Sequence, residues 1–169
     1  MKTYDVDKYL NDSELVDELI KDFKKKKIIT NISSNADVKG HILKSSHNLE
    51  FVNDIDKNKF IDWAIIGCYY AAYHSALALI QSKGFTSKNH LATLLVLINE
   101  FYQKGLNEED IESLMNVLSY EDILFYVETK NKREDASYSS RIIFDRKDLE
   151  SLKLKTILFV SKVKKILNN

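Results

Sequence analysis

The chain of 169 residues contains no proline, four glycines and a single cysteine. Strand-rich folds need frequent turn residues, and α/β nucleotide-binding folds need glycines clustered at a phosphate loop, so both classes are disfavoured. Because Cys68 is the only cysteine, the chain cannot form an intramolecular disulfide or a cysteine-based zinc cage, and a single thiol suits a reducing compartment. The amino terminus has no apolar segment of the signal-peptide type, so we expect a cytoplasmic protein.

Neither sign of charge is in excess, because 25 lysine and arginine residues balance 25 aspartate and glutamate residues. The protein therefore has no overall field to attract a polyanion, and any nucleic-acid contact must come from a local patch. With 44% hydrophobic and 30% charged residues, the composition is typical of a soluble globular protein. The length predicts a single domain with at most a small appendage.

One long stretch, residues 63–80, contains no aspartate, glutamate, lysine or arginine and approaches the length of a membrane span. Three tyrosines, His74 and Ser75 lie in its middle, where a lipid-facing helix carries leucine, isoleucine and valine. We therefore predict a central helix buried inside a soluble bundle, with no membrane as a partner. Small residues that would let another helix approach closely recur at Ala64, Gly67, Cys68, Ala71, Ser75 and Ala78.

Apolar residues recur at helical spacing along most of the chain, which predicts an all-α, antiparallel up-and-down bundle of five to seven helices. Residues 1–30 are assigned to an N-terminal helical extension and residues 31–169 to the bundle. Between helices, we expect a polar break at 29–34 and a short link at 85–87. The expected helices cover about 13–28, 34–52, 60–83, 87–102, 107–118 and 145–166.

Short polar side chains mark the expected helix starts. Asn107 with Asp110 fits a capping box, while Ser87 and Asp145 fit single N-caps. Gly84 is placed to end the central helix, because glycine readily adopts the left-handed conformation that follows a helix C-terminus.

Four histidines raise the question of a metal site. His41 and His47 are six residues apart, while His74 and His90 fall on different expected helices. No His-Glu-x-x-His or Glu-x-x-His spacing occurs, so no helix offers two ligands in these patterns. We expect no metal and no cofactor, although a site assembled from distant residues stays open. The sequence also has no nucleophile elbow and no glycine-rich phosphate loop.

The densest polar cluster of the central helix contains Tyr69, Tyr70, Tyr73 and His74. Tyr70 and His74 are four residues apart and share one helix face, so they can hydrogen-bond to each other or to a third group. Two interpretations stay open, a structural network or the lining of a pocket or symmetric interface. The role of the lysine run at 24–27 also stays open, because such lysines either complement the helix dipole or bind RNA.

Arginine occurs only as Arg133, Arg141 and Arg146, while lysine supplies all other fixed cationic side chains. A guanidinium can bind a carboxylate or a phosphate through two parallel hydrogen bonds. Within the block 133–138 (REDASY), Arg133 therefore indicates either an internal carboxylate pair or a phosphate-binding site.

Several short motifs follow one another along the predicted bundle: Trp63, 69–79 (YYAAYHSALAL), 82–85 (SKGF), 87–90 (SKNH) and the block 133–138. In this order they resemble a HEPN domain, a small helical domain of archaea and bacteria that is often encoded beside a minimal nucleotidyltransferase. The resemblance covers roughly residue 35 to the C-terminus. It implies a helical bundle that commonly forms a homodimer, and many members are metal-independent ribonucleases, often toxins restrained by the nucleotidyltransferase.

The resemblance implies an active site in which a histidine follows an arginine after four to six residues. The arginine would steady the scissile phosphate, and the histidine would transfer protons near neutral pH. This chain departs from the pattern, because all four histidines precede all three arginines. Tyr138 stands where the histidine is expected, and a phenol with a pKa of about 10 is a poor general base at neutral pH.

The leading hypothesis is therefore a HEPN-like homodimer that binds a nucleotide or RNA phosphate, or a partner nucleotidyltransferase, within a pair of the toxin–antitoxin type. Arg133, Asp135 and Tyr138 would bind the phosphate, and Tyr70 and His74 are further binding candidates.

Two other hypotheses belong to different classes. One is a metal-independent endoribonuclease with a divergent site, in which His74 or His90 transfers the proton after folding brings it near Arg133. The other is a scaffold in which the polar clusters only stabilise the bundle.

Overall fold

The computed structural model describes residues 6–31, 36–56, 60–120 and 145–168. These residues form seven helices and one small two-stranded sheet, which confirms the predicted all-α bundle. In chain order the elements are α1 (Val6–Asn11), α2 (Ser13–Lys25), β1 (Ile29–Asn31), α3 (Ala36–Asp56), α4 (Ile61–Ser82), β2 (Phe85–Ser87), α5 (His90–Phe101), α6 (Glu108–Leu118) and α8 (Arg146–Leu167).

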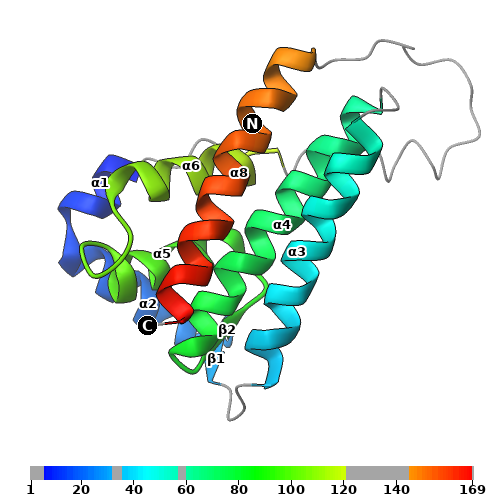
Figure 1. The fold of residues 1–169 in the computed structure, drawn as a ribbon. Helices are drawn as coiled ribbons and strands as arrows, with labels where there is room; N and C mark the ends of the chain where they lie inside the picture. Colours follow the sequence, from blue (N-terminus) through cyan, green and yellow to red (C-terminus); the bar gives the residue numbers. More distant parts are fainter. Residues whose placement is uncertain (1–5, 32–35, 57–59, 121–144, 169) are drawn as a thin grey trace, which may run out of the picture.

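Helix α4 is the centre of the bundle, and α3 and α8 run alongside it (Figure 1). Helices α5 and α6 also contact α4. By length and composition α4 would be able to cross a membrane, but 78% of its most apolar stretch is buried inside the protein. Its high content of apolar residues is therefore accounted for by contacts with other helices, as the sequence predicted.

The small residues of α4 allow α3 to approach closely. Gly67 is a point of close approach, because a Cβ atom added there would lie 2.5 Å from Cγ2 of Val52 and 3.2 Å from Cδ1 of Phe51. Two turns further along, Ser75 and Ser45 are both buried, and their hydroxyl oxygens lie 2.7 Å apart in a hydrogen bond between the helices. The predicted close approach is confirmed, and α3 is the helix that makes it.

Helix boundaries follow the local capping chemistry. Asn107 and Asp110 form the expected capping box at α6, and Asp145 forms another with Asp148 at α8. Gly84 follows α4 with a positive φ of 81°. At α5 the prediction is wrong, because Asn89 is the N-cap and accepts a hydrogen bond from the backbone amide of Ala92.

Ser87 does not cap α5 because it belongs to a strand. Residues 29–31 and 85–87, predicted as a polar break and a short link, pair as antiparallel strands with Thr30 opposite Thr86. Ile29 at the start of β1 is 2% exposed and belongs to the core. The Ser87 hydroxyl instead accepts a hydrogen bond from the amide of Asn89.

The N-terminal segment packs on the bundle through α2, which contacts α5. Val16 and Ile20 on α2 are buried within the same core as the residues of α4 and α5. The last turn of α2 carries Lys24 and Lys25, a position at which lysines complement the helix dipole, and the ammonium of Lys24 lies 4.5 Å from the centre of the Phe85 ring in β2. The short sheet and this contact join α2 to the start of α5.

Candidate functional site

Helix α4 carries two side-chain clusters between its middle and its C-terminal end, and the neighbours α3 and α5 complete them. His74 faces α3, where it meets His41, and Tyr69 faces the start of α5, where it meets His90. Tyr69 is buried, whereas Tyr70, Tyr73 and all three histidines are partly exposed. The clusters therefore lie at the edge of the core, where a side chain can support the fold and also meet a ligand.

The first cluster is a chain of three polar side chains, Gln81, His41 and His74. The Nδ1 atoms of His41 and His74 lie 2.8 Å apart, and Nε2 of Gln81 lies 3.0 Å from Nε2 of His41. A nitrogen–nitrogen hydrogen bond requires one ring to donate and the other to accept, so the two imidazoles cannot both be protonated. The cluster therefore holds at most one positive charge.

The surroundings of this pair favour the neutral state of both rings. The pKa of His74 is lowered to about 4, chiefly by burial and then by the nearby His41 and Lys44. The pKa of His41 is also lowered, chiefly by burial and then by Lys44, while Asp37 opposes the change. His74 is therefore neutral at pH 7, and it holds too little of its protonated form to act as a general acid.

The second cluster joins α4 to the first residue of α5. The Tyr69 hydroxyl and Nε2 of His90 lie 2.7 Å apart in a hydrogen bond, and the edge of Tyr73 contacts the His90 ring with centroids 4.6 Å apart. Nδ1 of His90 is buried. Both ring nitrogens of His90 are thus kept from a ligand, one by burial and the other by Tyr69.

We expect the substitution Tyr69→Phe to lower the free energy of unfolding by about 1 to 2 kcal/mol, because it removes the hydroxyl partner of His90 and keeps the ring. Chemical denaturation of both proteins measures the difference. Tyr70→Phe is the matched control, since the partly exposed Tyr70 is engaged through its ring, and its effect should stay within about 0.5 kcal/mol. Equal losses at the two positions would contradict a role for the Tyr69–His90 bond.

Tyr70 and His74 share one face of α4, as predicted from their spacing. Their rings are stacked with centroids 6.3 Å apart and an angle of 25° between the planes. Tyr73 lies between the two clusters, because its ring is also 6.4 Å from that of His74. The clusters thus form one continuous aromatic surface along α4, although no contact joins His74 directly to His90 within the described residues.

One group of acidic side chains has the spacing of a cation site. Asp7 of α1 and Glu108 and Glu112 of α6 place carboxylate oxygens within 4.8 Å of one another. All three are exposed, and exposed carboxylates commonly gather without an ion. This group therefore does not identify a metal centre.

A comparison with known proteins matches the part of the chain that contains both clusters. The family model for the HEPN domain matches residues 38–166, which include nearly all of α3 and α8 and everything between them. The chain belongs to the HEPN family. A protein named putative toxin MJ0605, from Methanocaldococcus jannaschii, is 25% identical over 124 residues, which cover 71% of this chain and 92% of that relative.

Part of the molecule lies outside the HEPN match. Helices α1 and α2 and strand β1 precede residue 38 and lie outside the matched region. The two clusters described above, which involve α3, α4 and α5, lie within it.

The structure places some of the site residues predicted for this HEPN protein and not others. It brings His74 and Tyr70 together and holds His90 separately against Tyr69. Arg133, Asp135 and Tyr138 lie outside the described residues. Sequence analysis missed Gln81 as a member of the histidine chain and did not pair His41 with His74, because a contact between residues 33 positions apart leaves no local signal.

Proposed function

We propose that this HEPN protein is a binding protein whose ligand is the phosphate of RNA or of a nucleotide. Arg133 would bind the phosphate through its guanidinium, with Asp135 to orient it and Tyr138 to stack or hydrogen-bond. Tyr70 and His74 would contribute the partly exposed aromatic face of α4. The proposal rests on the lowered pKa of His74 and on the burial and hydrogen bonding of His90, since a phosphate-binding role needs no proton transfer.

These properties of the two histidines favour binding of RNA over its cleavage. A catalytic acid or base works best with a pKa near the working pH and a nitrogen that reaches the substrate. The pKa of His74 is lowered to about 4, and His90 has one nitrogen buried and the other bonded to Tyr69. Neither histidine candidate meets both requirements.

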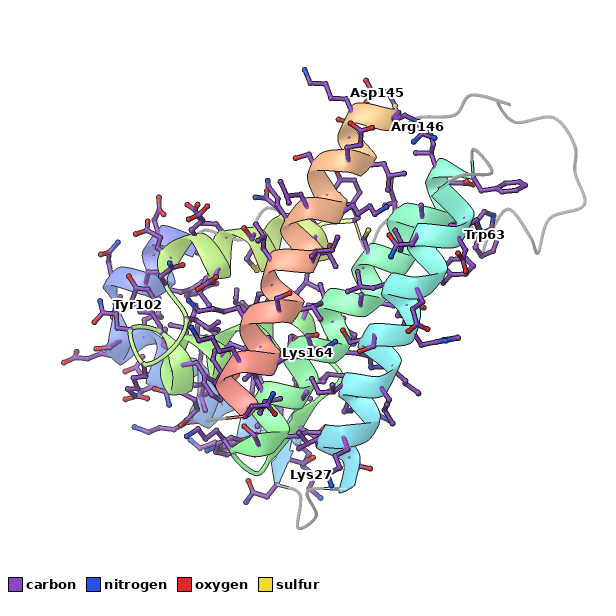
Figure 2. All side chains as sticks on the ribbon, in the orientation of Figure 1. Lys27, Trp63, Tyr102, Asp145, Arg146 and Lys164 are labelled. Atoms are coloured by element: carbon purple, nitrogen blue, oxygen red, sulfur yellow. The ribbon has the colours of Figure 1, made fainter. Side chains whose placement is uncertain are left out.

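A homodimer and a nucleotidyltransferase partner, in a toxin–antitoxin pair in the cytoplasm, complete the proposal. Support for a protein partner comes from α8, whose side chains of Leu154 and Leu158 are 59% and 60% exposed, with Ile157 exposed beside them. Trp63, at the start of α4, also projects outward (Figure 2). Exposed apolar groups of this size commonly mark surfaces that other chains cover.

We expect Arg133→Ala to weaken binding of single-stranded RNA by about tenfold, the loss that follows removal of one charge-assisted contact to phosphate. Fluorescence anisotropy with a labelled oligoribonucleotide measures the affinity, and circular dichroism checks the fold. Arg141→Ala, eight residues away, is the control for a general loss of positive charge and should change the affinity less than twofold. An affinity unchanged by Arg133→Ala would overturn the proposal.

The naming of the relative as a toxin favours a second candidate, a metal-independent endoribonuclease with a divergent site. This activity would cut RNA in the presence of a chelator and would be abolished by His74→Ala or His90→Ala. A protein that binds RNA through Arg133 and leaves it intact under these conditions would settle the choice in favour of binding.

A further inference from the structure

A hollow of about 440 Å³ lies where the turn after α2 meets the turn before α5. Its polar lining comes from both turns and both strands, namely Lys27, Thr30, Thr86, Ser87, Lys88 and Asn89. Figure 2 shows Lys27 at this end of the molecule, close to the short sheet. The volume lies within the range of about 300 to 1,000 Å³ that is usual for small-molecule sites.

The charge of the hollow is positive. Two lysines line it, and none of its seven lining residues is an aspartate or glutamate. Among the residues that the structure describes, neither Lys27 nor Lys88 forms an ion pair with a carboxylate. The two ammonium groups come from segments 61 positions apart, so the fold itself gathers them at one opening.

The backbone of Lys27 adopts an unfavourable conformation. Its φ is 56°, in the left-handed region, and the amide of the next residue, Ile28, donates to the carbonyl of Phe23 to close the end of α2. Glycine suits this position best, and another residue costs about 1 kcal/mol or more there. The fold tolerates this cost and thereby places a lysine side chain beside the hollow.

The uncharged groups of the lining suit the same kind of ligand. Thr30 and Thr86 are directly opposite each other in the antiparallel pair, so they lie on the same face of the sheet and both line the hollow. Asn89, the N-cap of helix α5, also lines the hollow. Threonine hydroxyl groups and two ammonium groups together form a lining for an anion with several oxygen atoms.

We propose that this hollow binds a phosphate-bearing ligand, held by Lys27 on one side and Lys88 on the other. None of the seven lining residues belongs to the block 133–138, and three of them, Lys27, Ile28 and Thr30, precede the region matched by the HEPN family. The hollow therefore combines residues that precede the matched region with residues inside it. The source of the phosphate is either a free nucleotide or the backbone of a single-stranded RNA.

Titration calorimetry of the full chain with tripolyphosphate, ATP and an unstructured oligoribonucleotide tests the site. We expect tripolyphosphate to bind, and Lys27→Gly and Lys88→Gln each to weaken it by about tenfold. Lys27→Gly is informative because it relaxes the backbone, so thermal stability should rise or stay equal while affinity falls. Lys25→Gln, in the same lysine run but outside the hollow, is the control and should change affinity less than twofold.

Comparison of the three ligands in this experiment identifies the source of the phosphate. Tighter binding of ATP than of tripolyphosphate, with the same dependence on Lys27 and Lys88, would support a free nucleotide, and tighter binding of RNA would support its backbone. Amide chemical shifts of Thr30 and of residues 86–89 should move on binding. Absence of tripolyphosphate binding, or equal effects of Lys27→Gly and Lys25→Gln, would overturn the site, whatever Arg133→Ala does to RNA affinity.

Discussion

Gly67→Val is expected to destabilise the protein by about 3 kcal/mol, the upper part of the usual range for overpacking a core. The first added carbon would already lie 2.5 Å from Cγ2 of Val52, a distance that carbon atoms do not occupy without a shift. Val52 is fully buried and has a stiff branched side chain, so it cannot rotate away cheaply. The α3–α4 contact must therefore open, and urea denaturation would measure the loss.

Gly40 on α3 provides a matched control. A Cβ atom at that position meets no other atom within 4 Å, so Gly40→Val should stay within about 0.5 kcal/mol of the unmodified protein. A second test is the pair Gly67→Ala and Val52→Ala. If the helices meet as described, the double variant loses less stability than the sum of the single variants. Equal effects of valine at positions 40 and 67 would show that α3 does not pack on Gly67.

Acidification is expected to weaken the fold through the His41–His74 pair. The folded-state pKa of His74 is lowered to about 4 from an ordinary value of 6.5, so the unfolded chain binds a proton there at higher pH than the folded protein does. The stabilisation from the neutral ring is therefore complete above pH 6.5 and is lost as the pH falls toward 4. Because the ring is only half-buried, we expect the loss to be about 1 to 2 kcal/mol.

Carboxylates also titrate over this pH range, so the prediction concerns a difference between variants. Denaturation at pH 7 and at pH 4.5 should show a smaller fall in stability for His74→Gln than for the unmodified protein. His47→Gln is the control, because His47 is exposed on the same helix as His41, and it should retain the full pH dependence. If His74→Gln and His47→Gln gave the same pH dependence, the histidine pair would not be the group responsible.

The features predicted correctly from the sequence are those set by local chemistry. The capping box of Asn107 and Asp110 involves residues three positions apart, and the end of α4 at Gly84 depends on the conformational freedom of one residue. The buried stripe of α4 was also predictable, because burial on all sides leaves a helix without charged residues in its middle. In each case the sequence signal and its structural cause occupy the same few residues.

The features that the sequence analysis missed depend on partners far away along the chain. Strands β1 and β2 have three residues each and pair Ile29 with Ser87, so neither segment has the length or alternation that marks a strand. That pairing also explains why the N-cap of α5 is Asn89, two residues later than predicted. The His41–His74 contact has the same origin, because spacing within one helix gives no information about which side chain of a neighbouring helix it will meet.

The pairing of β1 with β2 and the packing of α2 on α5 determine which residues a stable fragment of this protein must contain. A fragment cut at the family boundary, residue 38, would lose the strand that covers β2 and the side chains of Val16 and Ile20 from the core. Backbone groups of β2 and apolar groups of α5 would then face water. The packed core of this molecule is thus larger than the region that the HEPN family model matches, and the matched region gains part of its stability from the segment ahead of it.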